Sequence, residues 1–205
     1  AVTNLPLDEN NPDNLTTLLS YLNREQYGEQ PFLDRRYSPE PQHRPTWENY
    51  TGDFDFMWRY QINHMFTRYL LWQYVGRAGY DQNDGIDYKF LGIPMALGLL
   101  GIWVHFRRDW KLAFVFMMMF IAMGVVTALY QNQQDPQPRE RDYFYVGAFM
   151  VYSMWIGIGI YGLIEMIREA MKKETFMAGG ALILAASFVF VPLNMLKVNY
   201  HYQDR

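Results

Sequence analysis

The chain has 205 residues, of which 50% are hydrophobic and 19% are charged, and its formal net charge is −3. It contains no cysteine, which excludes disulfides, iron–sulfur clusters and thiolate metal sites. Residues 1–87 hold 13 acidic and 7 basic residues, and a segment this acidic argues against a nucleic-acid partner, which requires a basic face.

The mean hydropathy of −0.20 is typical of a soluble protein, but it averages two different halves. We expect residues 1–87 to form an extramembrane or interfacial segment and residues 88–205 to form a four-helix transmembrane bundle. The predicted fold class is therefore all-α integral membrane. Because the sequence starts at Ala1 and shows no signal-peptide pattern, we expect a processed product or a fragment of a longer protein.

An amphipathic helix is predicted over residues 15–27. Its leucines recur at helical spacing, at positions 15, 18, 19 and 22, behind Asn14 as a cap. Gly28 and Pro31 are stop signals. Prolines at positions 31, 39, 41 and 45 then exclude long regular structure, so a loop is predicted up to residue 55.

A second amphipathic helix is predicted over residues 58–76. Its stripe of aromatic residues, which includes Trp58 and Trp72, is typical of a membrane interface, and Arg68 and Arg77 are assigned to the same interface. The alternative is a helix that packs on the ends of the transmembrane bundle.

Four apolar stretches follow, each close to the ~20 residues that a helix needs to cross ~30 Å of hydrocarbon. The predicted spans cover residues 90–106, 112–131, 143–164 and 175–196. Small residues in them predict close contacts between helices. These are glycines 92, 98, 101, 157, 159 and 162 and alanines 181 and 185. No span carries a charge in its middle, which argues against a pump or channel.

The sidedness of the spans is predicted from the basic residues in short loops. The compact basic turns at residues 107–111 and 168–173 are assigned to the cytoplasm, although a similar number of basic residues lies on the other side. This assignment places residues 1–87, the loop 135–142 and the C-terminus outside. The expected location is the inner membrane of a bacterium, with residues 1–87 on the periplasmic side.

The first candidate site is the polar connector between the second and third spans, residues 132–143. Arg139 and Arg141 are the right groups to bind a lipid phosphate, and Glu140 or Asp142 beside them is a candidate carboxylate base. The alternative is an ordinary solvated turn whose charges anchor the third span.

A second candidate lies at the end of the first amphipathic helix. Asn23, Arg24 and Glu25 suit sugar hydroxyls, and they equally suit a hydrogen-bonded helix end capped by Gly28. The histidines, at positions 43, 64, 105 and 201, are dispersed, with no second histidine one helical turn away. No metal site, haem or other cofactor is therefore predicted.

Four separated motifs resemble a known family. They are YLNREQYG at 21–28, QINHM with further matches at 61–77, HFRRDW at 105–110 and PRERDY at 138–143. In this order they resemble the later membrane region of the bacterial protein O-mannosyltransferase-like family, common in Bacteroidetes and relatives. The resemblance extends from about residue 15 to 165. That family is similar to the GT-C glycosyltransferases, polytopic membrane enzymes that move a sugar from a polyprenyl-phosphate carrier to an acceptor at the outer face.

The resemblance implies an inverting sugar transfer. It implies that Arg139 and Arg141 contact the carrier phosphate and that Glu140 or Asp142 is an accessory carboxylate. It also implies that the sugar or the acceptor contacts Asn23, Arg24 and Glu25.

The chain departs from the family in one respect. Family members have many more spans upstream, and related enzymes carry their base in an earlier outer loop that is absent here. We therefore expect a portion of a glycosyltransferase that is not active alone and that works with upstream helices or other membrane subunits. The alternative is a noncatalytic subunit that braces a larger membrane complex.

Overall fold

The computed structural model describes residues 14–23, 34, 35, 37, 38, 40–79 and 84–170, with isolated positions between 179 and 200. The chain divides into two compact units, residues 1–35 and 36–205. The regular secondary structure of the described residues is helical, apart from one isolated β-bridge between Arg77 and Ile86.

The first unit contains helix α1, Leu15–Leu22. Asn14 caps it, because the Asn14 side chain accepts a hydrogen bond from the Thr17 N–H at 2.9 Å and the Thr17 hydroxyl accepts one from the Asn14 N–H at 3.2 Å. The described helix ends at Leu22, with Asn23 as its C-cap. Residues 24–27 of the predicted helix lie outside the described residues.

The second unit begins with two single-turn helices, η2 (Pro41–His43) and α2 (Arg44–Trp47). A proline lies at the start of each, where the missing N–H would have no partner in the helix. This segment was predicted to be a loop. The prolines prevent long helices there, but they also favour the first turn of short ones.

A continuous helical run then extends from residue 53 to 74. It consists of α3 (Asp53–Phe56), the π-helical segment η3 (Met57–Thr67) and α4 (Arg68–Tyr74). It starts five residues before the predicted position of 58, because Asp53 and Asp55 occupy the first turn, where acidic side chains interact favourably with the helix dipole.

The apolar half contains α5 (Ile93–Arg108), then α6 (Trp110–Ile121), η4 (Ala122–Val126) and α7 (Thr127–Gln131), which form one run. It ends with η5 (Asp142–Tyr145) and α8 (Val146–Ala170). Among the described residues, two helices are long and apolar enough to cross a membrane, Trp110–Gln131 and Asp142–Glu169. Helix α5 has 16 residues, or about 24 Å at ~1.5 Å per residue, which is shorter than the hydrocarbon layer. The predicted span at 175–196 lies outside the continuously described chain.

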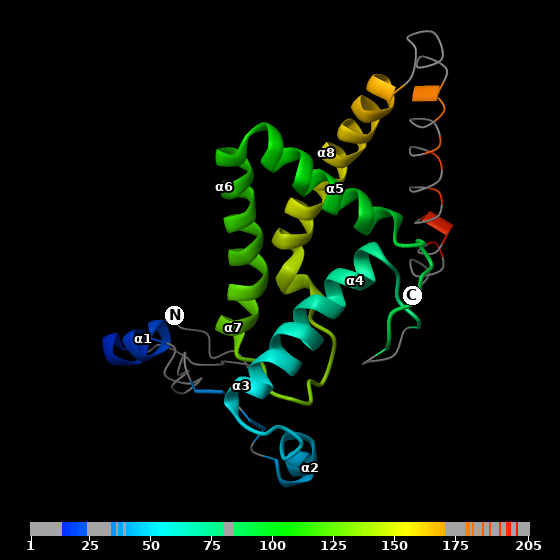
Figure 1. The fold of residues 1–205 in the computed structure, drawn as a ribbon. Coiled ribbons are helices and arrows are strands. Elements are labelled where there is room, and N and C mark those ends of the chain that lie inside the picture. The colour runs from blue at the N-terminus through cyan, green and yellow to red at the C-terminus, as the bar shows by residue number, and fades with distance from the viewer. Residues whose placement is uncertain are drawn as a thin grey trace. The chain divides into compact units, whose positions relative to one another are not determined.

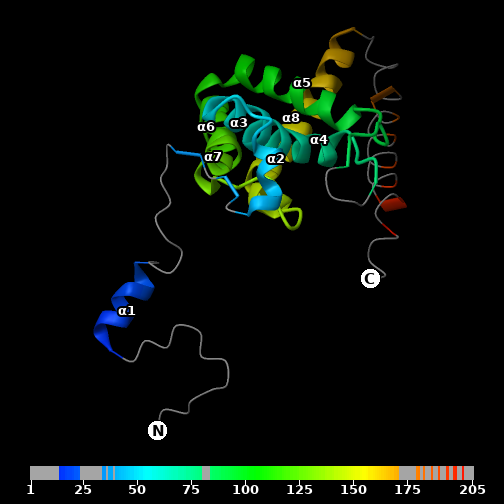
Figure 2. The same cartoon turned by 90° about the horizontal axis from the view of Figure 1, so that it is seen from below.

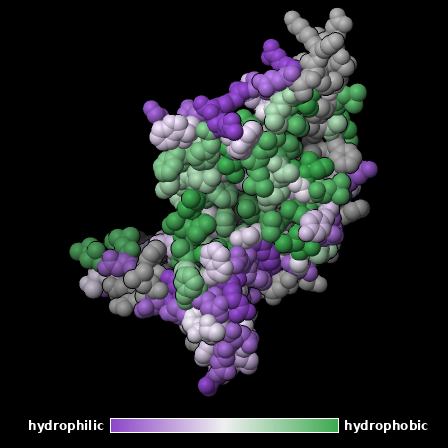
Figure 3. Space-filling model, in the orientation of Figure 1, coloured by the Kyte–Doolittle hydropathy of each residue, from purple (hydrophilic) through white to green (hydrophobic). Residues whose placement is uncertain are grey.

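Both long helices expose their apolar residues. Only 17% of the most apolar window of Trp110–Gln131 is buried, and only 33% of that of Asp142–Glu169, whereas the core helix of a soluble protein is mostly buried. On the face drawn in Figure 3, apolar residues form a band between polar ends. A surface of this kind needs lipid or another protein segment against it.

Helix α5 crosses α8 with the two backbones in contact (Figure 1). A Cβ atom added to Gly101 would lie 1.8 Å from the Trp155 carbonyl oxygen, and one added to Gly159 would lie 1.9 Å from the Leu97 carbonyl oxygen. Gly98 and Gly162 face side chains of the opposite helix in the same way. The prediction of close helix contacts is thus confirmed at these four glycines.

Two other glycines do not make helix contacts. An added Cβ would meet nothing within 4 Å at Gly92 or Gly157, so the packing prediction is wrong for both. Gly92 instead precedes α5 with a φ of 67°, in the left-handed region that favours glycine. The glycine pattern alone does not distinguish these two roles.

The helical run 53–74 packs against the apolar helices (Figure 1 and Figure 2). Phe66 fills the space beside Gly124 in η4. The Tyr74 hydroxyl donates to the Phe149 carbonyl oxygen at 2.5 Å and lies 2.9 Å from the Ser153 hydroxyl. The run therefore lies against protein on this face.

Candidate functional site

An ion pair joins helix α4 to the polar connector. The Arg68 guanidinium donates through Nη1 to Glu140 Oε1 at 3.3 Å and through Nη2 to Glu140 Oε2 at 3.0 Å. Both side chains are largely removed from water, with 9% of Arg68 and 20% of Glu140 exposed. Arg68 Nε also donates to the His64 carbonyl oxygen at 2.9 Å, which fixes the orientation of the guanidinium. This bidentate arrangement is strong and directional.

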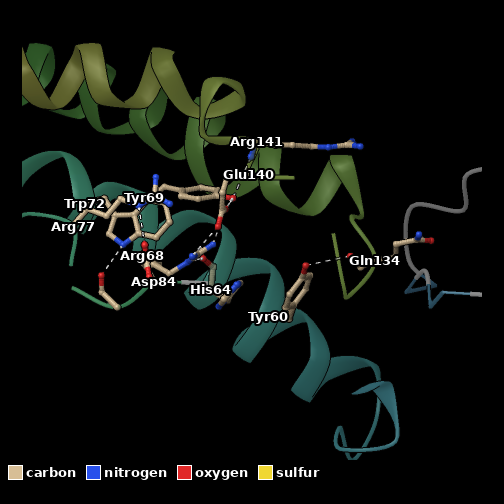
Figure 4. Close-up of polar contacts among 11 residues, drawn as sticks. Tyr60, His64, Arg68, Tyr69, Trp72, Arg77, Asp84, Gln134, Glu140 and Arg141 are labelled. Atoms are coloured by element: carbon tan, nitrogen blue, oxygen red, sulfur yellow. Dashed lines mark hydrogen bonds and ion pairs between the residues drawn. The ribbon is translucent and has the colours of Figure 1, made fainter. Parts of the chain in front are cut away.

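Tyr69 extends this pair to the connector backbone (Figure 4). Its hydroxyl donates a short hydrogen bond to Glu140 Oε2 and accepts one from the Arg141 N–H at 3.2 Å. Burial and the hydrogen bond to Glu140 raise the pKa of Tyr69, so the phenol remains protonated and continues to donate. Glu140 is thus held by a guanidinium and a phenol from the same helix.

Trp72 stacks between two guanidinium groups. The Arg68 Cζ lies 4.2 Å from the centroid of the Trp72 ring and the Arg77 Cζ lies 4.0 Å from it. The indole N–H donates to the Gly85 carbonyl oxygen at 3.2 Å, and Arg77 pairs with Asp84 at 3.7 Å. The cation–π contact with Trp72 helps to hold Arg68 in place.

The connector is fixed at further points by side chains of η3. Gln61 donates to the Asn132 side chain at 2.9 Å and to the Gln133 carbonyl oxygen at 3.3 Å. Tyr60 donates to the Gln134 carbonyl oxygen at 3.2 Å. Burial is the main cause of a raised pKa at Tyr60, which keeps it a donor. An ordinary solvated turn would not have these buried contacts.

The pairing of Glu140 with Arg68 leaves its two neighbouring arginines without a carboxylate. Within the described residues, neither Arg139 nor Arg141 has an ion-pair partner. The Arg141 side chain points away from Glu140 (Figure 4), and its Nε is buried with no hydrogen-bond acceptor in the described part of the chain. Arg139 is exposed and lines a small hollow with Tyr60, His64 and Glu140.

A larger, open hollow of about 320 Å³ lies beside the small one and shares Tyr60 and His64 as its wall. Tyr50, Arg59 and Asp135 complete its lining. The Tyr50 hydroxyl donates to Asp135 Oδ2 at 2.7 Å, and burial together with this bond raises the pKa of Tyr50.

The structure brings together some of the residues predicted for the site. Arg139, Glu140 and Arg141 surround the ion pair, whereas Asp142 begins η5, and its side chain makes no hydrogen bond or ion pair with the rest of the described chain. Asn23 caps α1 in the other unit. Arg24 and Glu25 lie outside the described residues.

The residues assigned to a membrane interface have different surroundings. Trp58 is 52% exposed, but Arg68 and Trp72 are 8% and 6% exposed and face protein groups. Arg68 is buried beside its ion-pair partner Glu140, which is distant in sequence. Trp72 is buried beside Arg77, which lies in the segment that follows the helix. Arg77 is half-buried beside Trp72 and Asp84.

Sequence reasoning missed the residues that organise this site. Tyr69 and Gln61 were treated as parts of helix stripes, and Tyr60, Tyr50, Arg59 and Asp135 were not selected. The helical spacing of Gln61, Arg68 and Tyr69 on a helix predicted to be amphipathic was a usable signal that a polar partner lay against it. The described residues contain no group of three or more His, Asp or Glu side chains that could hold a metal ion.

Comparisons with known proteins identify no relative. No family model, no curated protein and no solved structure matches the chain.

Proposed function

We propose that the chain is a portion of a polyprenyl-phosphate-sugar-dependent glycosyltransferase of the protein O-mannosyltransferase-like type. Its connector 132–142 binds the carrier phosphate at the outer face of a bacterial inner membrane. The four ordered motifs support the family, and the two long apolar helices support a membrane location. Catalysis requires the upstream helices that carry the base in related enzymes.

The observation that supports this proposal most is that the connector carries two arginines whose neighbouring carboxylate is paired elsewhere. Glu140 lies between two arginines but forms its ion pair with Arg68. Arg139 and Arg141 therefore remain cationic without a carboxylate in the described structure, at the start of a helix apolar enough to enter a membrane. A lipid phosphate is an anion that reaches this position, and a guanidinium matches its oxygens bidentately.

The geometry assigns different roles to the candidate carboxylates. Glu140 is engaged by Arg68 and Tyr69, so it positions the connector and does not collect a proton from an acceptor. Asp142 stays available as the accessory carboxylate. Arg139 lines the small hollow, whereas the Arg141 side chain points away from Glu140 (Figure 4).

A binding measurement tests this proposal. The purified full chain in nanodiscs is titrated with a polyprenyl phosphate, with the neutral polyprenol as a reference ligand. Replacing both arginines (Arg139→Ala with Arg141→Ala) is expected to weaken binding of the phosphate by at least about tenfold, because each charge-assisted hydrogen bond contributes roughly 1.5–3 kcal/mol. The control is Arg44→Ala, since Arg44 is exposed and pairs with Glu48 on its own short helix.

Unchanged binding by the double variant overturns the phosphate assignment. Equal affinity for the phosphate and for polyprenol overturns it as well, because the arginines would then contribute nothing.

The alternative function, a noncatalytic subunit that braces a membrane complex, is favoured by the exposed apolar residues of α6, such as Phe114, Val115 and Met118. The same surface would receive the upstream helices of an enzyme. Carrier binding distinguishes the two proposals, because a bracing subunit has no need of it.

A further inference from the structure

We propose that the open hollow lined by Tyr50, Arg59, Tyr60, His64 and Asp135 is a binding site for a neutral hexopyranose ring. The inference rests on the proposed function, because it supplies the sugar subsite beside the phosphate-binding arginines. The volume of about 320 Å³ is sufficient for one hexose and lies at the small end of ligand sites.

The polar groups of the hollow match vicinal hydroxyls. Asp135 accepts from Tyr50 through Oδ2, and its Oδ1 has no hydrogen-bond donor among the described residues. Arg59 donates through Nη1 to Asp55 Oδ2 at 3.2 Å and to the Asn49 carbonyl oxygen at 3.4 Å. Its Nε and Nη2 form no hydrogen bond in the described part of the chain, so the hollow offers both an acceptor and donors to a sugar.

The balance of charge argues against an anion in this hollow. Asp135 lines it directly, and Arg59 is neutralised by its pairing with Asp55. The Thr51 N–H and Arg59 lower the pKa of Asp55, so this carboxylate is ionised at neutral pH. A phosphate in the hollow would face the Asp135 carboxylate directly, and the guanidinium of Arg59 is already shared with Asp55. A neutral polyol does not experience this repulsion.

The position of the hollow fits a sugar phosphate. Tyr60 and His64 line both hollows, with Asp135 on one side of this wall and Arg139 on the other. The rings of Tyr60 and His64 stack at 5.3 Å, which gives the wall a rigid aromatic edge. A carrier phosphate at Arg139 would therefore have its sugar near Asp135.

Saturation-transfer difference NMR on the full chain in nanodiscs tests this inference. The probes are the methyl α-glycosides of mannose, glucose and galactose, with inorganic phosphate as the anionic competitor. We expect saturation transfer to at least one glycoside and at least about a tenfold weaker affinity in Asp135→Asn, since one charged hydrogen-bond acceptor is lost. The amide retains an acceptor for Tyr50, which preserves the fold.

Arg59→Gln is the second variant, because the Arg59 side chain is largely exposed and its loss leaves the core intact. It is also expected to weaken glycoside binding, whereas Glu48→Gln, at the C-cap of α2, is the matched control and keeps wild-type affinity. Wild-type affinity in both Asp135→Asn and Arg59→Gln overturns the inference, as does the absence of transfer to any of the three glycosides.

Two outcomes separate this inference from the proposed function. Displacement of the glycoside by inorganic phosphate, with phosphate binding lost in Arg59→Gln and strengthened in Asp135→Asn, would mean that the hollow binds an anion and would overturn the sugar assignment. Polyprenyl phosphate binding that depends on Arg139, without glycoside binding, would leave the proposed function standing while the sugar subsite fails.

Discussion

The crossing of α5 and α8 and the junction between helix 53–74 and the connector 132–142 are held together by different means in their buried parts. At the crossing, glycines bring two backbones into contact, and Trp155 and Tyr152 add hydrogen bonds to α5. The ion pair of α5 with α8, between Arg108 and Glu165, is partly exposed. At the junction, a largely buried ion pair and three side chains of one helix fix an irregular segment. Close packing holds the apolar helices, while directional polar contacts hold the segment proposed to bind the ligand.

The largest effect is expected from Gly101→Val at the crossing. An added Cβ would overlap the Trp155 carbonyl group, and neither backbone can move without separating the helices. We expect a loss of at least about 3 kcal/mol in stability or no folded protein. Detergent-solubilised yield and thermal unfolding followed by circular dichroism measure it.

The control for this variant is Gly157→Ala, where an added Cβ meets nothing within 4 Å. It is expected to be neutral or slightly stabilising, because alanine favours the helix by up to ~1 kcal/mol. Equal damage from both variants would contradict the account of the crossing.

Removing Arg68 is expected to have the next largest effect. Arg68→Ala leaves Glu140 largely buried beside Tyr69 without its cation, which costs about 3 kcal/mol. The double variant with Glu140→Gln should recover part of this loss, because no unpaired charge then remains. Additive losses in the thermal unfolding of the single and double variants would show that the two side chains do not interact.

A smaller effect on stability is expected at Tyr74, the last residue of the same helix, α4. Tyr74→Phe removes the hydroxyl that donates to the Phe149 carbonyl oxygen, with a loss of about 1 kcal/mol. The exposed Tyr130 provides the matched control as Tyr130→Phe, which should change the unfolding temperature little. A null result at Tyr74 would mean that this hydroxyl does not fasten α4 to α8.

The smallest effect concerns Asp55, whose pKa is lowered by the Thr51 N–H and by Arg59. A folded pKa below the unfolded value of 3.8 stabilises the protein at neutral pH, and this contribution is lost as the pH falls through the folded pKa. Asp55→Asn should therefore be slightly less stable than wild type at pH 7, with the difference disappearing in acid. A difference that grows in acid would contradict this sign.

The two regions also differ in what the sequence could predict. The glycines on α5 and α8 recur at helical spacing, so a close approach was visible locally, as was the apolar length of residues 110–131 and 142–169. The start of α5 at residue 93, where residue 90 was predicted, was not visible, because Gly92 adopts a left-handed conformation just before the helix. A local sequence pattern therefore predicts which helix faces pack closely, but it predicts only approximately where each helix begins and ends.

The junction was only partly visible from sequence. The charges of the connector marked it as a candidate, but Arg68 and Glu140 are separated by 72 residues and only the fold makes them partners. Arg68 was therefore assigned to the membrane interface and Glu140 to catalysis. The same reason hid Asp135, whose partner Tyr50 lies 85 residues away.

Cysteine labelling across the membrane tests the central claim most directly, because the native chain has no cysteine. Gln137→Cys lies in the connector, and Lys111→Cys lies in the first turn of α6, at the other end of Trp110–Gln131. With a membrane-impermeant maleimide, the account predicts labelling of position 137 in cells with a permeabilised outer membrane, and labelling of position 111 only after the inner membrane is opened. Labelling of both positions from the same side would show that the helix does not cross, and the reversed pattern would place the arginines away from the outer face.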